Sequence, residues 1–307
     1  MITTFAHWIR ASIAGGLVSI NTLLHAAPIV SLSLAKLALP IRSLRRELSL
    51  WMAALGESWI GVNNRLMAWL TPTRWVLSGD LALSRARRYL VLSNHQSWVD
   101  IPVLQKVLNR RIPFQRFFLK DSLFWVPVLG LAWWALDFPF MKRASKSEIA
   151  KNPKLATRDL DAARKACAKF RELPVSIMNF VEGTRANARK LAESSYRHLL
   201  QPKSGGVAQV LNSMGELLDG IVDVTIVYPD GRPTIMDLIA GKIREIRVDL
   251  SFRPVPAELL GGNYETDPDY RKRFQAWLNT LWAEKDARIE QLLSVARASP
   301  EPTPAAS

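Results

Sequence analysis

The chain has 307 residues, 49% of them hydrophobic, so it can bury one large or two small domain cores, and intrinsic disorder over most of its length is excluded. Lys and Arg number 41 against 27 Asp and Glu, and the formal charge of +14 implies an anionic partner, either nucleic acid or an anionic membrane surface. The single cysteine excludes an internal disulfide framework and any multi-cysteine metal site. Eleven tryptophans favour the membrane, because tryptophan prefers the membrane–water interface.

The N-terminal segment has the composition of a membrane anchor. Residues Ala11–Ala35 carry no charge, and about 20 apolar residues suffice to cross a bilayer. Four basic residues follow between positions 36 and 46, so the positive-inside rule predicts that the rest of the chain is cytoplasmic. A cleaved signal peptide is the alternative, and Pro28 could break the segment into a kinked or re-entrant hairpin. We therefore expect residues 1–45 to form a helical membrane anchor, with its topology left open.

Residues 46–74 are predicted to form an amphipathic helix. Apolar side chains recur at steps of three and four from Leu48 to Trp69, whereas Glu57 and Arg65 fall largely on the other side. The helix either packs on the core of the domain or lies in the membrane interface with its tryptophans at headgroup level.

Short apolar runs alternate with helical stretches over residues 75–296, which predicts an α/β domain with a mostly parallel or mixed sheet flanked by helices. Strands are expected at Trp75–Leu77, Tyr89–Ser93, Phe117–Leu119, Phe138–Met141, Val175–Phe180, Val222–Tyr228 and Glu245–Phe252. The clearest helices are Thr157–Arg171, Gly206–Leu218 and Pro268–Leu293. The last strand alternates as a half-exposed edge or return strand would. Residues 124–140 are expected to form an apolar wall, and the proline-rich residues 297–307 a disordered tail.

The stretch Asn94–Asp100, N-H-Q-S-W-V-D, follows a predicted strand and contains a candidate catalytic pair. In a regular helix, five steps of roughly 100° would place His95 and Asp100 about 140° apart. They can meet only if His95 lies in the turn before a helix that Ser97 caps and Asp100 lies in its first turns. The aspartate would then hold the Nδ1 proton and leave Nε2 free to accept a proton from a hydroxyl. A strand-end histidine with only local hydrogen bonds is the alternative.

Three further strand ends carry cations and turn-forming residues. Lys142 and Arg143 follow one strand, the tetrapeptide Glu182–Arg185 (E-G-T-R) follows a second, and Lys203 precedes two glycines at the start of a helix. An arginine offers a bidentate fork for a phosphate, and a helix N-terminus favours an anion. Because a base and several cations converge at strand ends, the sequence predicts a site for a phosphate-bearing substrate with a reactive hydroxyl.

These motifs resemble those of the glycerolipid acyltransferases. The Asn94–Asp100 stretch is similar to their first motif, Phe140–Arg143 to the second, Phe180–Arg185 to the third, and Val224–Pro229 to a variant of the fourth. The resemblance spans about residues 75–230 and is strongest to the bacterial lysophosphatidate acyltransferases and their lysocardiolipin acyltransferase-like branch. The usual fourth motif more often has two prolines, of which only Pro229 remains here.

The resemblance implies a membrane enzyme that transfers an acyl chain from acyl-CoA or acyl carrier protein to the sn-2 hydroxyl of 1-acyl-sn-glycerol-3-phosphate, giving phosphatidic acid. His95 would be the general base and Asp100 its orienting partner. The phosphate would be held by a set of residues from the other strand ends: Lys142, Arg143, Glu182, Gly183, Thr184, Arg185 and Lys203. Glu182 would orient Arg185. No metal or further cofactor is expected, and the location implied is a bacterial inner membrane, with the catalytic domain facing the cytoplasm.

Other functions remain open. The acceptor could be another lysophospholipid, such as lysophosphatidylglycerol or lysocardiolipin. The charge of +14 would also suit a membrane-associated RNA-binding protein, although nucleic acid is not the expected partner. A serine hydrolase is disfavoured because the chain has no G-x-S-x-G stretch.

Overall fold

The structure is a computed structural model that describes residues 2–80, 82–141, 173–264 and 266–298, together with residues 165, 167, 168 and 170. The predicted helix at residues 157–171 falls largely outside the described residues. The last helix ends at Ala298, and the part of the predicted tail after it also lies outside the described residues.

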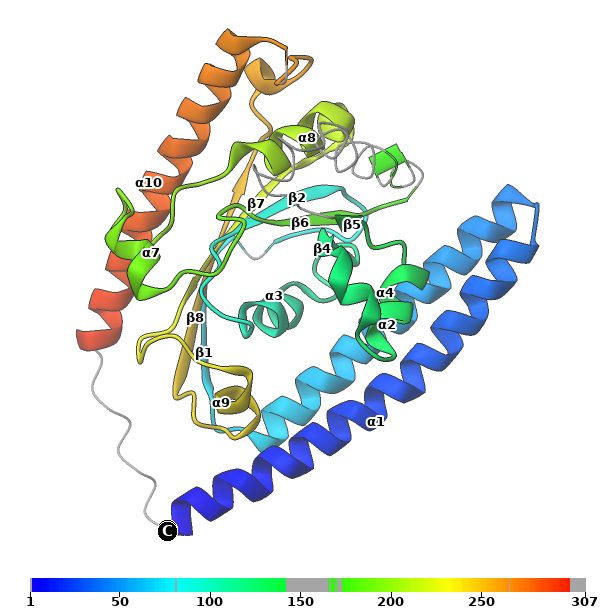
Figure 1. Cartoon of the computed structure of the whole chain (residues 1–307), viewed down its shortest axis with the longest axis vertical. Helices are drawn as coiled ribbons and strands as arrows, with labels where there is room; N and C mark the ends of the chain where they lie inside the picture. Colours follow the sequence, from blue (N-terminus) through cyan, green and yellow to red (C-terminus); the bar gives the residue numbers. More distant parts are fainter. Residues whose placement is uncertain are drawn as a thin grey trace.

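Two long helices form an antiparallel hairpin along one side of the molecule (Figure 1). Helix α1 (Ile2–Ala38) is continuous through Pro28, and the chain turns back at residues 39–41 into α2 (Arg42–Leu70). Asn21 donates from Nδ2 to Asn63 Oδ1 over 2.8 Å, and His25 Nε2 lies 3.1 Å from Ser58 Oγ. The alternative of a break at Pro28 is therefore excluded, because the turn comes after α1 rather than within it.

Helix α1 also contacts the rest of the chain near both of its ends. Nδ1 of His7 lies 2.8 Å from the carbonyl oxygen of Ala240, just after helix α9 (Ile235–Ile239). Nζ of Lys36 lies 2.7 Å from Asp137 Oδ2, just after helix α4 (Leu129–Ala135). By its length and composition, the part of this helix over Thr4–Ala38 could cross a membrane.

A six-stranded mixed sheet forms the centre of the domain, in the order β1-β8-β7-β2-β6-β3. The strands are β1 (Arg74–Gly79), β2 (Tyr89–Ser93), β3 (Gln115–Phe117), β6 (Ser176–Phe180), β7 (Gly220–Val227) and β8 (Glu245–Arg253). Strands β3, β6, β2 and β7 are parallel, β8 is antiparallel to β7, and β1 is parallel to β8. The predicted α/β class with a mixed sheet is confirmed.

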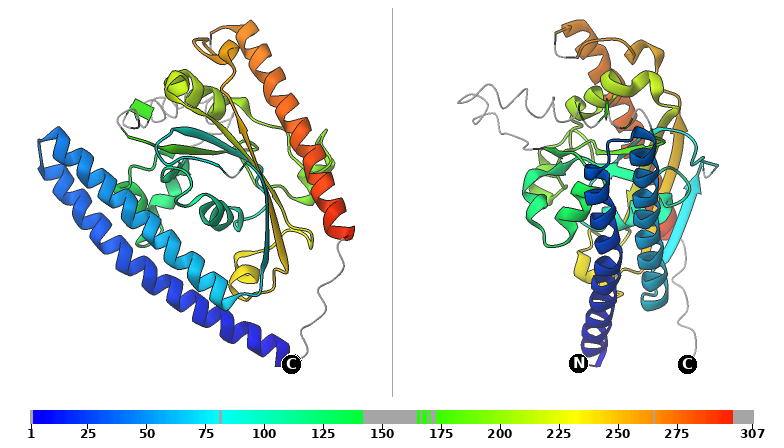
Figure 2. Two further views of the ribbon diagram at one scale, coloured as in Figure 1. Left: turned by 180° about the vertical axis from the view of Figure 1, so that it is seen from behind. Right: turned by 90° about the vertical axis from the view of Figure 1, so that its right-hand side faces the viewer.

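Helices cover both faces of this sheet (Figure 2). Because side chains alternate along a strand, Val91 of β2 packs with α3 (Asp100–Leu108), whereas Leu90 and Leu92 pack with α8 (Ser204–Met214) and α10 (Pro268–Ala298). The remaining elements are β4 (Leu119–Lys120) paired with β5 (Phe140–Met141), α7 (Ala188–Ala192), and the 3-10 turns η1 (Asp121–Trp125), η2 (Gly215–Leu217) and η3 (Ala257–Leu259).

The prediction that residues 245–252 form a half-exposed edge strand is wrong, although the predicted return direction is confirmed. Strand β8 pairs on both sides, with β7 and β1, and its polar residues Glu245, Arg247 and Asp249 are buried. Arg247 binds Glu245 two residues away, and Arg288 of α10 binds Asp249 over 2.6 Å. The alternation of polar and apolar residues therefore reflects buried ion pairs rather than contact with water.

Candidate active site

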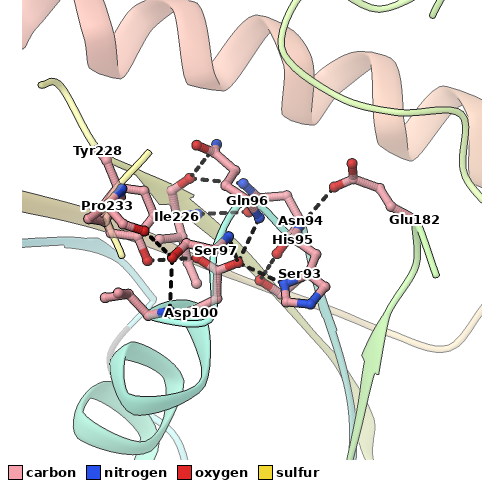
Figure 3. A network of polar contacts seen from close by, with 11 residues as sticks. Ser93, Asn94, His95, Gln96, Ser97, Asp100, Glu182, Ile226, Tyr228 and Pro233 are labelled. Carbon is pink, nitrogen blue, oxygen red and sulfur yellow. Dashed lines mark hydrogen bonds and ion pairs between the residues drawn. The ribbon is translucent and has the colours of Figure 1, made fainter. Parts of the chain in front are cut away.

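Polar residues at the ends of parallel strands meet at one edge of the sheet. His95 follows β2, Glu182 follows β6 and Tyr228 follows β7, and β2 lies between β6 and β7 with both pairings parallel. Figure 3 shows Tyr228 and the loop that carries His95 beside the start of α3, with Glu182 reaching that loop from the side. This is the sheet edge at which α/β proteins place ligands.

His95 and Asp100 form the predicted pair. His95 lies in the loop at residues 94–97, and its Nδ1 is 2.8 Å from Asp100 Oδ2. The Asp100 side chain is fully buried, whereas 13% of the His95 side chain is exposed. Among the described residues, Nε2 of His95 has no hydrogen-bond partner, so this nitrogen is available to a substrate. The expected loop position and Nδ1 contact are confirmed.

Asp100 accepts four hydrogen bonds, as a fixed anion would. Oδ2 also accepts from the amides of Gln96 (2.6 Å) and Ser97 (2.8 Å), and Oδ1 accepts from the Tyr228 hydroxyl (2.6 Å) (Figure 3). The expectation that Ser97 caps α3 is wrong, because Val99 occupies the N-cap position. The Ser97 hydroxyl instead accepts from the amide of Val99 (3.0 Å) and donates to the carbonyl of Pro233.

Two neighbours fix the loop that carries His95. Asn94 binds Ile226 of β7 twice, donating from Nδ2 to its carbonyl and accepting at Oδ1 from its amide, both over 2.9 Å. The ring of Phe180 stacks on the His95 imidazole, with centroids 3.9 Å apart and planes inclined by 15°. The histidine is therefore held by its backbone, by Nδ1 and by one ring face.

Glu182 acts on this loop rather than on Arg185. Its Oε1 accepts from the His95 amide (2.8 Å) and its Oε2 from the Leu200 amide (2.9 Å), so the expectation that it orients Arg185 is wrong. Burial raises the pKa of Glu182 to about 7, although the two amide hydrogen bonds lower it. The carboxyl group joins the loop after β2 to the segment before α8.

The other residues of the E-G-T-R segment lie beside cations. Gly183 has φ of +67°, which favours glycine, and a Cβ there would lie 3.1 Å from Lys203 Cδ. Thr184 Oγ1 accepts from Nζ of Lys190 over 2.8 Å. The exposed guanidinium of Arg185 lies over the ring of Trp98, 4.4 Å from its centroid. The structure thus brings Lys203 to the E-G-T-R segment, as the sequence predicts.

Lys142 and Arg143 lie outside the described residues. Sequence reasoning missed Tyr228 and Lys190. Tyr228 could have been found as a tyrosine at the end of an apolar strand. Lys190 could have been found as a lysine five residues after Arg185. In the described part of the chain, no group of three or more His, Cys, Asp or Glu residues could hold a metal ion.

Comparisons with known proteins agree with these motifs. A family model described as Acyltransferase matches residues 75–229. Lysocardiolipin acyltransferase 1 of Gallus gallus is 24% identical over 250 residues, which cover 76% of this chain and 61% of that protein. The 1-acyl-sn-glycerol-3-phosphate acyltransferase epsilon of Mus musculus is 31% identical over 173 residues, 52% of this chain and 45% of that protein. This chain thus matches less than two thirds of the length of either relative.

Among solved structures, the 1-acyl-sn-glycerophosphate (LPA) acyltransferase PlsC of Thermotoga maritima aligns with a TM-score of 0.49 and 14% identity, over 95% of this chain and 100% of that one. The family model covers just over half of the chain and includes His95, Asp100 and the Glu182–Arg185 segment. The chain therefore belongs to the acyltransferase family.

Proposed function

We propose that this protein transfers an acyl chain from acyl-CoA or acyl carrier protein to the sn-2 hydroxyl of a lysophospholipid, with 1-acyl-sn-glycerol-3-phosphate as the acceptor. The observation that carries the proposal is the His95–Asp100 pair, in which a buried carboxylate holds Nδ1 and leaves Nε2 without a partner among the described residues. The names of the relatives support a lysophospholipid acceptor, and lysocardiolipin is the alternative that one of those names suggests.

In the proposed reaction, Nε2 of His95 removes the proton of the acceptor hydroxyl while its oxygen attacks the thioester carbonyl. The tetrahedral intermediate collapses with cleavage of the C–S bond, and the departing thiolate takes the proton from Nε2. The products are the new ester and the free thiol. Asp100 stabilises the imidazolium that forms between the two proton transfers, because its carboxylate stays 2.8 Å from Nδ1.

The cations near the E-G-T-R segment would bind the phosphate of the acceptor. Arg185 offers two parallel donors, and Trp98 supports its planar group from one side. Lys203 precedes the N-terminus of α8, where free amides favour an anion. We propose the same role for Lys142 and Arg143, because they belong to the Phe140–Arg143 stretch that resembles the second acyltransferase motif.

The helix hairpin supports attachment to a membrane surface. Ten large apolar side chains on α1, α2 and η1 are each more than half exposed: Phe5, Trp8, Ile20, Leu23, Leu24, Leu34, Leu37, Trp51, Trp69 and Trp125. At about 1.5 Å per residue, α1 is roughly 55 Å long, well beyond the roughly 30 Å of a hydrocarbon core. Since both ends of α1 contact the domain, we propose that the hairpin lies along the interface, on the cytoplasmic side of a bacterial inner membrane. Failure of the full chain to float with anionic vesicles would contradict this.

The test is acyl transfer by the purified protein in mixed micelles, with 1-acyl-sn-glycerol-3-phosphate, lysophosphatidylglycerol and lysocardiolipin as acceptors and both acyl donors. We expect His95→Ala to lose roughly 100-fold or more in kcat, the contribution of a general base. His198→Ala is the matched control, because His198 pairs with Glu290 of α10 away from the site. A His95→Ala protein with full activity would refute the proposal, and salt-sensitive RNA binding untouched by that change would favour the RNA-binding alternative.

A further inference from the structure

Tyr228 is buried beside the candidate base and contacts its orienting partner. It directly follows β7, it is 4% exposed, and its hydroxyl donates to Asp100 Oδ1 over 2.6 Å (Figure 3). The bond crosses 128 residues of sequence and joins the end of β7 to the start of α3. Burial and the nearby Asp100 carboxylate raise the pKa of Tyr228 well above its usual range, so the phenol stays a donor throughout the working pH range.

The two oxygens of Asp100 are supported very differently. Oδ2 accepts from His95 and from two amides of its own loop. For Oδ1, Tyr228 is the one donor in the described part of the chain, and Asp100 has no exposed surface through which water could replace it. Without the hydroxyl, part of the negative charge would be buried without a hydrogen bond, which is costly.

We propose that Tyr228 is a positioning residue that sets the strength with which Asp100 binds the protonated form of His95. The proposal rests on the proposed role of His95 as the base. The hydroxyl of Tyr228 stabilises the Asp100 carboxylate most when the His95 imidazole is neutral. A protonated imidazole would itself balance the negative charge of the carboxylate. Loss of the Tyr228 hydroxyl therefore destabilises the pair with a neutral His95 more than the pair with a protonated His95. We expect the His95–Asp100 pair to keep its extra proton up to a higher pH.

Few other titratable groups face this pair in the described structure. Glu182 lies in the loop after β6 and accepts a hydrogen bond from the amide of His95. Lys285 of α10 interacts electrostatically with Glu182. Glu182 also interacts electrostatically with Asp100, but among the described residues neither Glu182 nor Lys285 forms a hydrogen bond or ion pair with the Asp100 carboxylate. A Tyr228→Phe substitution therefore leaves the hydrogen bonds of Glu182 and Lys285 in place.

The experiment compares Tyr228→Phe with Tyr270→Phe in the full-length protein. Tyr270 is a matched control, because it is 1% exposed and its hydroxyl donates over 2.7 Å to the carbonyl of Leu259, away from the site. We expect Tyr228→Phe to lower kcat roughly tenfold, as for the loss of a hydrogen bond to a charged group, with KM for the lysolipid within about twofold. We also expect the acidic limb of the kcat/KM profile to move to higher pH. An unchanged kcat, or a loss of kcat without this movement, would overturn the proposal.

A second measurement separates this proposal from the proposed function. The chain has four histidines, so the imidazole of His95 can be followed by nitrogen NMR after selective labelling and assigned with His95→Ala. The titration of His95 should move to higher pH in Tyr228→Phe and stay unchanged in Tyr270→Phe, whether or not the protein transfers acyl groups. An unmoved titration in Tyr228→Phe would overturn the role of Tyr228 alone, whereas an active His95→Ala protein would overturn the proposed function.

Discussion

Replacing Asp100 with asparagine removes the charge behind the candidate base while keeping most of its hydrogen bonds. The amide oxygen can take the position of Oδ2 and accept from Nδ1 of His95 and from the amides of Gln96 and Ser97. The amide nitrogen then faces Tyr228, whose hydroxyl can turn from donor to acceptor. Alanine would be a poorer test, because all four donors would lose the acceptor that the fully buried Asp100 side chain provides.

The expected magnitudes follow from these contacts. Each buried donor left without a partner costs about 1–3 kcal/mol, so Asp100→Ala would lose roughly 4–12 kcal/mol, comparable to the whole stability of a domain. Asp100→Asn should lose only about 1–2 kcal/mol, because the bonds remain without their charge assistance. Its kcat should nevertheless fall roughly 100- to 10,000-fold, because the imidazolium formed during the reaction loses its counter-ion.

The release of free thiol from acyl-CoA gives a direct assay, and the single cysteine of the protein, Cys167, is buried and adds little background. Chemical unfolding in the same micelles reports the stability. The double variant His95→Ala with Asp100→Asn should be no slower than the slower single variant, because two residues that act as a unit are not additive. A kcat for Asp100→Asn within about twofold of the unsubstituted protein would refute the reasoning.

Two further predictions concern the neighbouring strand end. Arg185→Lys keeps the charge but loses the bidentate fork and the contact with Trp98, so KM for the lysolipid should rise roughly tenfold with little change in kcat in initial-rate measurements. Glu182 has a pKa of about 7 in the fold against 4.5 for the ordinary group, so the folded state binds its proton more tightly. The free energy of unfolding should therefore fall by about 3 kcal/mol as the pH rises from 4.5 to 7, relative to the same titration of Glu182→Gln.

Each of these predictions has a clear contrary outcome. Arg189→Lys, an exposed change on α7, is the control for Arg185→Lys, and equal KM values for the two variants would remove Arg185 from the phosphate site. For Glu182, chemical unfolding at several pH values should show a difference between the two proteins that shrinks as the pH rises. A difference that stays constant would mean that folding does not change the pKa of Glu182.

The sequence predicts the buried strands well because their signal is local. Strand β2 is parallel to both of its neighbours and buried on both faces, so four of its five residues form a continuous apolar run. Strand β8 misled the interpretation because its charged residues are buried against partners such as Arg288, 39 positions from Asp249. A periodic pattern cannot separate a side chain that faces water from one that faces a distant counter-ion.

The same limit applies to the candidate site. His95 and Asp100 lie five residues apart, so their contact follows from the turn that separates them. The bonds from Asn94 to Ile226 and from Tyr228 to Asp100 depend on how β2 and β7 pair, over 132 and 128 positions. The structure places Glu182 beside His95, but its contacts are with the amides of His95 and Leu200 rather than with Arg185, because its backbone partners are set by loop geometry that residue types do not specify.

The stacking of Phe180 on His95 has a consequence for the order of the proposed reaction. With one ring face covered and Nδ1 bound, the imidazole cannot turn over, so a proton that arrives at Nε2 must also leave from Nε2. The acceptor oxygen and the thioester sulfur must then both come within reach of the same nitrogen. The proposed reaction therefore requires acceptor and donor to be bound together, in a ternary complex with the protein, before either product departs.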